Sequence, residues 1–355
     1  MKAFYRASLG FCVGVLVAAS WSHAASTKPD IVIVATGGTI AGAAKSETEA
    51  GYQAGAVAVD VLIDAVPQLK QLANVRGVQV ASIGSQDMND EVWIKLANTV
   101  NDLLASKDVD GVVITHGTDT MEETSYFLHL VVKSDKPVVL TGSMRPSTAM
   151  SADGPLNFYN AVAAAADPRA QGRGVLIAVN DDIHSAHDIN KTHTTDVETF
   201  SSHEPGLVGA SLFGTQHWYR SPTEPHTKQS EFAGKVSGPL PRVDVIYAHA
   251  GMSPDLIDAA VAAGAKGLVI AGVGDGNMTT PALDAVKRAI AKGVVVVRSS
   301  RVGAGIVRRD VEIKDAEVGT VAAITLNPSK SRVLLKLALT KSSDAAKIQG
   351  LFDRY

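Results

Sequence analysis

Short apolar runs alternate along the chain with stretches whose apolar residues recur at helical spacing. Eight runs are typical of buried strands, at residues 31–35, 77–83, 111–115, 137–141, 174–179, 243–248, 267–271 and 293–297. Helices are predicted at residues 91–105, 255–263, 282–291 and 345–355. Continuous apolar strands that alternate with helices indicate a mostly parallel sheet covered on both faces. The pattern therefore predicts an α/β protein.

The pattern breaks at residues 219–240. Pro222, Pro225, Gly238 and Pro239 stand there among polar residues, and proline and glycine interrupt regular structure. We interpret this stretch as a linker. It would join a larger N-terminal domain, 25–218, whose mostly parallel sheet is flanked by helices, to a smaller C-terminal α/β domain, 241–355.

The first 24 residues have the composition of a secretory signal peptide. Lys2 and Arg6 precede an apolar run at 9–19, and Ser22 and Ala24 place small residues where signal peptidase cleaves. The run is shorter than the ~20 apolar residues that span a bilayer. We expect export, cleavage near Ala24 and no membrane attachment afterwards. The one cysteine, Cys12, would leave with the signal, so the mature chain would form no disulfide.

Composition and charge narrow the functional classes. The chain is 46% hydrophobic and 19% charged, with a formal net charge of -3 and no long basic run. Nucleic-acid binding therefore lacks electrostatic support. Four histidines, at 184, 187, 193 and 203, fall in one polar stretch without a helical H-E-x-x-H motif, so we interpret them as solvated loop residues rather than metal ligands. We expect neither a metal nor a cofactor.

Hydroxyl residues and glycines follow three of the predicted strands. The segments after the strands are 36–42 (TGGTIAG), 115–120 (THGTDT) and 141–145 (TGSMR). In open parallel sheets, ligands bind at the carboxyl ends of strands. Glycines let the backbone approach a small ligand, and hydroxyls supply nucleophiles and hydrogen bonds. These segments are candidates for a binding or catalytic site.

Other interpretations of these segments remain open at this level. The glycine spacing after the first strand fits neither G-x-G-x-x-G nor a P-loop, and residues 272–276 (GVGDG) are only half a dinucleotide motif. Thr120 and Glu123 have the spacing of a capping box, which would merely begin a helix. No G-x-S-x-G is present. A neutral lysine could activate a hydroxyl, and Lys191 is a candidate, although a solvated charge is the simpler interpretation.

Two signatures together resemble a known family. Residues 36–42 (TGGTIAG) and 116–120 (HGTDT) are similar to those of the bacterial L-asparaginases, in particular the exported, periplasmic type II branch. The similarity continues through 83–90, 144–147, 151–155, 297–301 and 326–328, and covers essentially the whole mature chain. The resemblance implies hydrolysis of L-asparagine to L-aspartate and ammonia through a threonine nucleophile and an acyl-enzyme.

The resemblance also implies catalytic roles. Thr39 matches the nucleophile, and Tyr52 matches a tyrosine that assists it from a mobile lid, here residues 42–55. Thr118 matches the threonine that pairs with the family lysine, here Lys191. Glu312 matches a residue that a neighbouring subunit contributes, which implies a homotetramer with sites at subunit borders.

Substrate contacts follow from the same comparison. Ser85 and Gln86 would hold the α-carboxylate and nearby polar groups, and Asp119 would accept the α-ammonium. Ser143 would help to orient the amide. Asn277 would reach the site from a neighbouring subunit.

Three other functions remain possible. A glutaminase-asparaginase would differ only in space for one methylene, which discriminates by ~1–3 kcal/mol. A D-amino-acid or peptide amidase would accept other substrates. A periplasmic amino-acid-binding protein would need polar ligand contacts but no pairing of hydroxyl and lysine.

Overall fold

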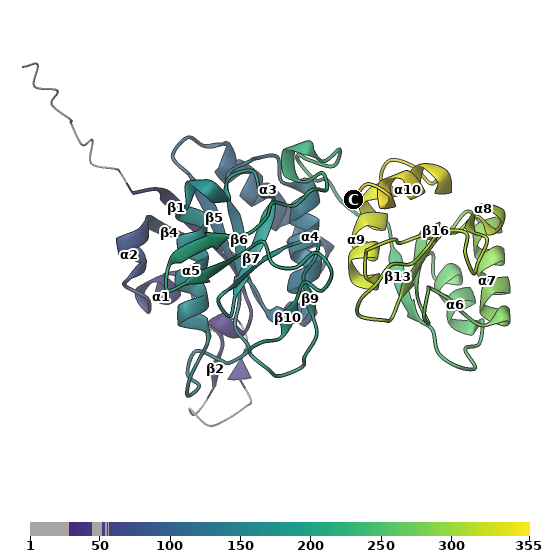
Figure 1. The fold of residues 1–355 in the computed structure, drawn as a ribbon, viewed down its shortest axis with the longest axis horizontal. Helices are drawn as coiled ribbons and strands as arrows, with labels where there is room; N and C mark the ends of the chain where they lie inside the picture. Colours follow the sequence, from purple (N-terminus) through teal and green to yellow (C-terminus); the bar gives the residue numbers. More distant parts are fainter. Residues whose placement is uncertain (1–27, 45–51, 54, 56) are drawn as a thin grey trace, which may run out of the picture.

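The computed structural model describes residues 28–44, 52–53, 55 and 57–355 (Figure 1). The predicted signal peptide and most of the predicted lid therefore lie outside the described residues. Within the described residues, no helix is both long and apolar enough to cross a membrane.

An eight-stranded sheet forms the centre of the N-terminal domain, in the order β12-β11-β8-β7-β6-β5-β1-β4. Its parallel strands are β1 (Asp30–Gly37), β4 (Asn74–Ile83), β5 (Gly111–Thr115), β6 (Val138–Thr141) and β7 (Val175–Val179). Three antiparallel strands extend it, namely β8 (Asp182–Ser185), β11 (Gly209–Leu212) and β12 (Thr215–Trp218). The predicted parallel strands are confirmed, whereas the antiparallel extension was not predicted.

Helices cover both faces of this sheet because successive strand residues point in opposite directions. Val32 and Val34 of β1 pack with α3 (Asp90–Ala105) and α4 (Met121–Val131). Ile31 and Ile33 face α1 (Val59–Asp64), α2 (Leu69–Leu72) and α5 (Gly154–Ala166) on the other side. The apolar residues 31–35 of β1 therefore lie in the middle of a three-layer domain.

A smaller parallel sheet, β13-β14-β15-β16, organises the C-terminal domain. Its strands are β13 (Val243–Tyr247), β14 (Gly267–Gly272), β15 (Val295–Ser300) and β16 (Val321–Ala322). One face packs on α6 (Asp255–Ala262) and α7 (Thr280–Ala291), and the other on α9 (Pro328–Ala338) and α10 (Ala345–Phe352). The short α8 (Asp315–Val318) precedes β16. The predicted two-domain α/β fold is thus confirmed.

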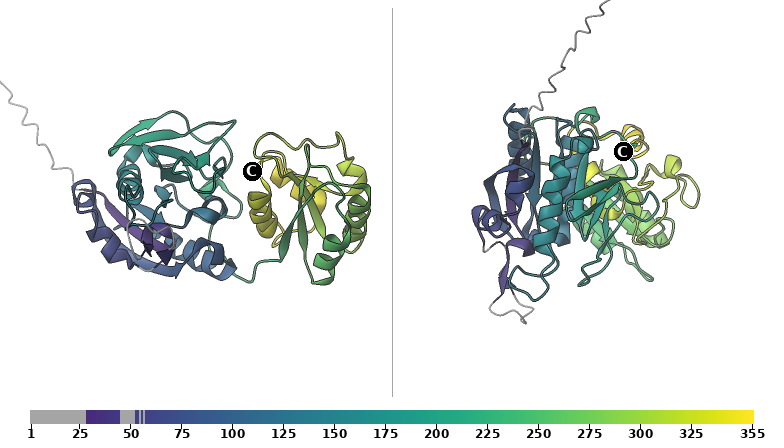
Figure 2. Two further views of the ribbon diagram at one scale, coloured as in Figure 1. Left: turned by 90° about the horizontal axis from the view of Figure 1, so that it is seen from below. Right: turned by 60° about the vertical axis from the view of Figure 1, so that its left-hand side comes forward.

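The two domains lie side by side, with α9 between the two sheets (Figure 2). Apolar residues of α9 share one buried cluster with α3 and α4. The chain between β12 and β13 contains only one short helix, η5 (Thr227–Gln229). It is tied to the N-terminal domain, because Asn98 exchanges two 3.0 Å hydrogen bonds with the Val236 backbone and Gly234 donates to Val131 O at 2.9 Å.

The interpretation of the four histidines as solvated loop residues is wrong for His184. This residue lies in β8 with 1% exposure, and its Nδ1 is 2.9 Å from Ser202 Oγ. Burial lowers its pKa to about 4. The sequence did not indicate the antiparallel strand β8, because the residues around His184 form no continuous apolar run.

Candidate active site

Three turns that follow β1, β4 and β5 meet at one edge of the large sheet. They contain the short helices η1 (Thr39–Ala41), η2 (Ser85–Asp87) and η3 (Thr118–Thr120). A methyl group at Gly38 would lie 2.3 Å from Gly117 N, and one at Gly117 would lie 2.6 Å from Ser85 Oγ. Only glycine permits these approaches. The structure therefore brings the segments of Thr39, Ser85 and Thr118 together.

Thr118, Asp119 and Lys191 form the polar centre of this edge. Lys191 lies in β9 (Asn190–Lys191), and its Nζ is 2.9 Å from Thr118 Oγ1 and 2.6 Å from Asp119 Oδ1. Thr118 is 5% exposed, and the side chains of Lys191 and Asp119 are 15% and 63% exposed. The lysine thus joins a buried hydroxyl to a carboxylate that remains open to a ligand.

Ser85 fixes the turn that carries these residues. Its Oγ accepts a hydrogen bond from Asp119 N at 3.2 Å, and its carbonyl accepts one from Thr120 Oγ1 at 2.8 Å. The capping-box prediction is wrong in this respect. Helix α4 does follow Thr120, but the threonine hydroxyl binds Ser85 and makes no side-chain capping bond. Thr120 therefore ties η3 to η2.

Thr39 begins η1 and is 5% exposed. The hairpin after it pairs β2 (Ala43–Ala44) with β3 (Tyr52–Gln53), and Ala44 lies opposite Tyr52. Gly55 N donates to Gly38 O at 3.1 Å, which anchors the base of the hairpin beside Thr39. The Tyr52 side chain lies outside the described part of the structure, so its predicted position is untested.

Gln86 and Ser143 complete the predicted residues of the N-terminal domain. The exposed Gln86 side chain lies over Gly84, where an added methyl group would meet it at 2.4 Å. Ser143 is 1% exposed, and its hydroxyl donates to Arg145 O at 2.7 Å. The Ser143 hydroxyl is thus occupied within its own loop.

Glu122 and Asn327 support Lys191, and neither was singled out from the sequence as a site residue. Glu122 Oε2 accepts from Lys191 N at 2.9 Å, and Glu122 Oε1 accepts from Asn327 Nδ2 at 3.0 Å. Asn327 Nδ2 also lies 2.6 Å from Asn190 Oδ1. The C-terminal domain therefore holds the strand that presents the lysine. These contacts join distant parts of the chain, and no local pattern could have indicated them.

His116 lies under the Thr118 turn. It is completely buried, and its Nδ1 is 2.7 Å from Gly117 O. Burial lowers the pKa of His116 to about 4, against a smaller opposing effect of that hydrogen bond. The imidazole is therefore neutral near pH 7, and Nδ1 must carry the hydrogen that it donates.

A cavity of about 420 Å³ opens beside Lys191. It is lined by Asp119, Glu122, Lys191, Thr192, His193 and Thr194. A second cavity, of about 400 Å³, lies between the domains, but neither Asp119 nor Lys191 lines it. Among the described residues, no group of three or more histidine, cysteine, aspartate or glutamate side chains is arranged to hold a metal ion. The polar cavity beside Lys191 is therefore the candidate substrate site.

Two family models match the chain. The model of the N-terminal asparaginase domain matches residues 30–224, and that of the glutaminase/asparaginase C-terminal domain matches residues 242–352. The chain belongs to the asparaginase family. Its two structural domains correspond to the two domains of that family.

Individual relatives of the asparaginase family match over nearly the full chain. A probable periplasmic L-asparaginase of Haemophilus influenzae is 50% identical, over 93% of this chain and 94% of its own. L-asparaginase 2 of Escherichia coli K12 is 50% identical, over 94% and 96%. A glutaminase-asparaginase of Acinetobacter glutaminasificans is 48% identical, over 92% and 100%. The crystal structure of a probable cytoplasmic L-asparaginase from Campylobacter jejuni superposes with a TM-score of 0.90, at 48% identity over 92% and 100%.

Asn277 and Glu312, the two remaining residues that the asparaginase resemblance indicated, lie in the C-terminal domain. Asn277 is half-buried and closes a turn by exchanging two 2.8 Å backbone hydrogen bonds with Val273. Glu312 is exposed. Neither residue lines the cavity beside Lys191. Within the described single chain they are therefore not part of the Thr118 site.

Proposed function

We propose that this protein hydrolyses the side-chain amide of L-asparagine to give L-aspartate and ammonia. The observation that carries the proposal is the position of Lys191 Nζ, 2.9 Å from Thr118 Oγ1 and 2.6 Å from Asp119 Oδ1. A hydroxyl beside a lysine is one arrangement that supports nucleophilic cleavage of an amide, because the lysine can take part in transfer of the hydroxyl proton. The family membership and the names of the relatives support the same reaction.

The substrate would be held by its two charged groups. The exposed carboxylate of Asp119 would bind the α-ammonium, and it already contacts one ammonium, that of Lys191. Ser85 and Gln86 would bind the α-carboxylate, with Ser143 near the amide. With its α-ammonium and α-carboxylate bound in this way, the substrate would present its amide carbon to the turn that carries Thr39.

The reaction would proceed in two steps. Thr39 Oγ1 attacks the amide carbon, its proton passes to a base, and backbone N–H groups of the glycine-containing turns stabilise the oxyanion. The C–N bond breaks, and the amine leaves as ammonia after taking up a proton. Tyr52 and the Thr118–Lys191 pair would move these protons. Water then hydrolyses the aspartyl ester on Thr39.

A second copy of the chain would complete the site. In the chain segment that leads to Glu312, the apolar side chains of Val302, Ile306 and Val311 are exposed by 53%, 59% and 44%. Exposed apolar residues that gather on one surface are typical of interfaces. We propose that residues 302–312, together with Asn277, pack on the Lys191 cavity of a neighbour, in a homotetramer.

Hydrolysis of L-glutamine is the second candidate function. The observation that favours it is the 48% identity to a protein named glutaminase-asparaginase. One methylene changes transition-state binding by only ~1–3 kcal/mol, so we expect glutaminase activity that is weaker but measurable.

Ammonia release from L-asparagine and L-glutamine tests both reactions. We expect release from asparagine that disappears in Thr39→Ala and falls in Lys191→Met. If neither amino acid is hydrolysed while calorimetry shows that they bind, the amino-acid-binding protein is the better interpretation. Activity of Thr39→Ala equal to wild type would refute the proposed nucleophile.

We also propose that the chain is exported to the periplasm, after cleavage near Ala24, and that residues 219–240 separate the domains. The relative from Haemophilus influenzae is named periplasmic, whereas the structural relative from Campylobacter jejuni is named cytoplasmic. N-terminal sequencing of the protein from a periplasmic fraction decides this point. A chain that retains Met1 in the cytoplasm would refute export.

A further inference from the structure

Arg298 is a fully buried cation in the C-terminal domain. It lies in β15 with 0% exposure, and its Nε and Nη2 are each 2.6 Å from an Asp315 carboxylate oxygen. Desolvation of such a pair is costly, and apolar residues of similar volume often stabilise a fold at least as well. Net stability alone therefore does not account for this ion pair, whereas its contacts with the neighbouring chain segments do.

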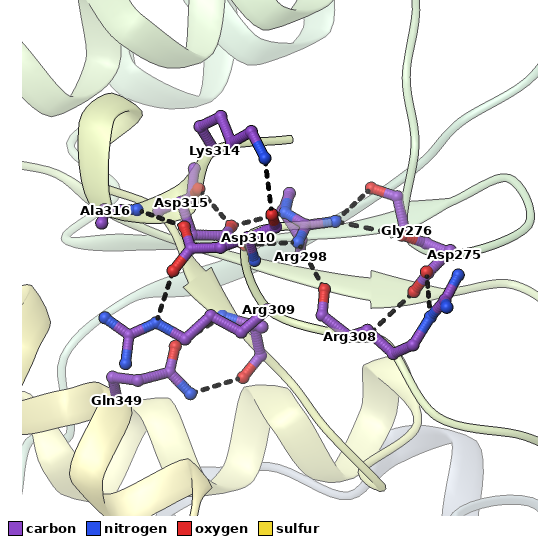
Figure 3. A network of polar contacts seen from close by, with 12 residues as sticks. Asp275, Gly276, Arg298, Arg308, Arg309, Asp310, Lys314, Asp315, Ala316 and Gln349 are labelled. Carbon is purple, nitrogen blue, oxygen red and sulfur yellow. Dashed lines mark hydrogen bonds and ion pairs between the residues drawn. The ribbon is translucent and has the colours of Figure 1, made fainter. Parts of the chain in front are cut away.

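We propose that Arg298 and Asp315 are positioning residues for the active site of a neighbouring copy, because they fix the two segments that carry Asn277 and Glu312. Figure 3 shows this network of polar contacts. The inference rests on the function proposed above, in which those two residues complete a site across a subunit border.

The first segment is the turn before Asn277. Arg298 Nη1 donates to Asp275 O at 3.0 Å and to Gly276 O at 3.3 Å. Gly276 has φ +73°, and a methyl group there would lie 2.9 Å from Arg298 Nη1. Asp275 is held in turn by Arg308, whose N and Nε donate to its carboxylate at 2.7 and 2.8 Å. The Arg298 guanidinium therefore fixes the position of the backbone that leads to Asn277.

The second segment is the loop that carries Glu312. Asp315 accepts hydrogen bonds from Asp310 N at 2.9 Å and from Thr320 Oγ1 at 2.6 Å. The Asp310 side chain accepts one from Ala316 N at 2.9 Å. Both ends of this loop are thus tied to the same carboxylate, and Glu312 lies exposed between them.

One guanidinium joins the two segments. Arg298 Nη2 donates to Arg308 O at 3.2 Å, and the Arg308 side chain is the one that holds Asp275. The Asn277 turn and the Glu312 loop therefore cannot shift independently while Arg298 is in place. A lysine could keep the charge opposite Asp315, but it has no planar fork that reaches both segments.

Arg298→Lys tests the inference directly. We expect the KM for L-asparagine to rise roughly tenfold with a smaller change in kcat, the order of effect of misplacing one charged contact. Arg308→Ala, at a side chain that is 61% exposed and so tolerates change, should raise KM by about threefold. Arg288→Ala is the matched control, because it breaks another exposed arginine pair of this domain, with Asp258, and should leave KM unchanged.

Mixed oligomers separate positioning from general damage to the fold. Co-assembly of Thr118→Val subunits with Arg298→Lys subunits creates sites that take Thr118 from one chain and an intact Arg298 network from the other. We expect these hybrids to recover the wild-type KM in part of their sites. A role confined to the stability of the mutated subunit would give no such recovery.

The outcomes distinguish the two proposals. If the wild-type protein releases no ammonia from asparagine, the proposed function fails and this inference fails with it. If the wild type is active but Arg298→Lys and Arg308→Ala both fold and keep its KM, only the positioning inference is overturned. If Arg298→Lys does not fold, the KM of Arg308→Ala tests the positioning inference: a raised KM supports it, and an unchanged KM overturns it. Hybrids that keep the raised KM also overturn the inference.

Discussion

Replacing Gly38 by alanine should disable the site without unfolding the protein. Gly38 has φ +82° and ψ -175°, a region that is almost exclusive to glycine. Its added methyl group would lie 2.3 Å from Gly117 N and 2.5 Å from Gly117 Cα. Both are backbone atoms, so no side-chain rotation can relieve the clash. The turns that carry Thr39 and Thr118 must therefore separate.

The size of the effect follows from this geometry. The two turns must move apart by about 1 Å to restore ordinary van der Waals contact, and a misplacement of ~1 Å costs about 10²-fold in rate. We expect kcat/KM for L-asparagine to fall about 100-fold. Backbone strain of this kind costs about 1–3 kcal/mol, which lowers Tm by only a few degrees. Gly38→Ala should thus lose most of its activity and little of its stability.

Gly172→Ala is the matched control. Gly172 also has a positive φ, +73°, but an added methyl group there has nothing within 4 Å. This variant should lose comparable stability and keep its ammonia-release rate. The comparison uses steady-state kinetics and calorimetric Tm values on both proteins. If Gly38→Ala were as active as Gly172→Ala, the contact between the two turns would not be what places the threonines.

Three further predictions concern the supports of the site and the core. Asn327→Ala should lower kcat about tenfold, because Glu122 loses the 3.0 Å contact that steadies the Lys191 strand, and steady-state ammonia release would show it. Leu334→Ala should cost about 2–5 kcal/mol in urea unfolding, because Leu334 is fully buried in the cluster shared by the two domains, whereas Leu256→Ala, at a 62% exposed position, should cost under about 0.5. A loss of unfolding free energy that differs between the two domains would contradict a shared core. Burial holds the pKa of His184 at about 4, below its ordinary value of 6.5, so the unfolded chain binds the proton first and stability should fall as the pH falls from 6.5 to 4. His184→Gln should make this decline shallower in urea titrations, while His116, whose pKa burial lowers to the same value, keeps part of it; an unchanged slope would refute the prediction.

The sequence predicted the parallel part of the fold well, because those strands are buried on both faces. Residues 111–115 are uniformly apolar up to Thr115, and the strand β5 has those bounds. The strands β8, β11 and β12 were missed. They lie at the edge of the sheet and contain polar residues such as His184 and Gln216, so their pairing depends on contacts that no local pattern records.

The candidate site was predictable to the extent that the sheet places it. Segments that follow parallel strands must meet at one edge, so the segments of Thr39, Thr118 and Ser143 could be grouped before their contacts were seen. Ser85 was indicated only by the family resemblance. Lys191 needed the family resemblance, because it comes from a short strand, β9, in a polar region. Glu122 and Asn327 are 205 residues apart and meet only in the folded chain. Local pattern therefore indicates where the chemistry lies, while the residues that steady it come from long-range packing.

The same reasoning explains why the Arg298 network escaped the sequence. Residues 297–301 were noted only as part of a resemblance, and an arginine in an apolar strand gives no sign of whether it faces solvent or the core. Its partner Asp315 is 17 positions away in the sequence, and its carbonyl acceptors are 10, 22 and 23 positions away. A buried charge is stable only where every hydrogen bond is satisfied. The loops that accept hydrogen bonds from Arg298 are therefore held as firmly as the strand β15. A residue that reaches into the active site of another subunit would need to be held in this way.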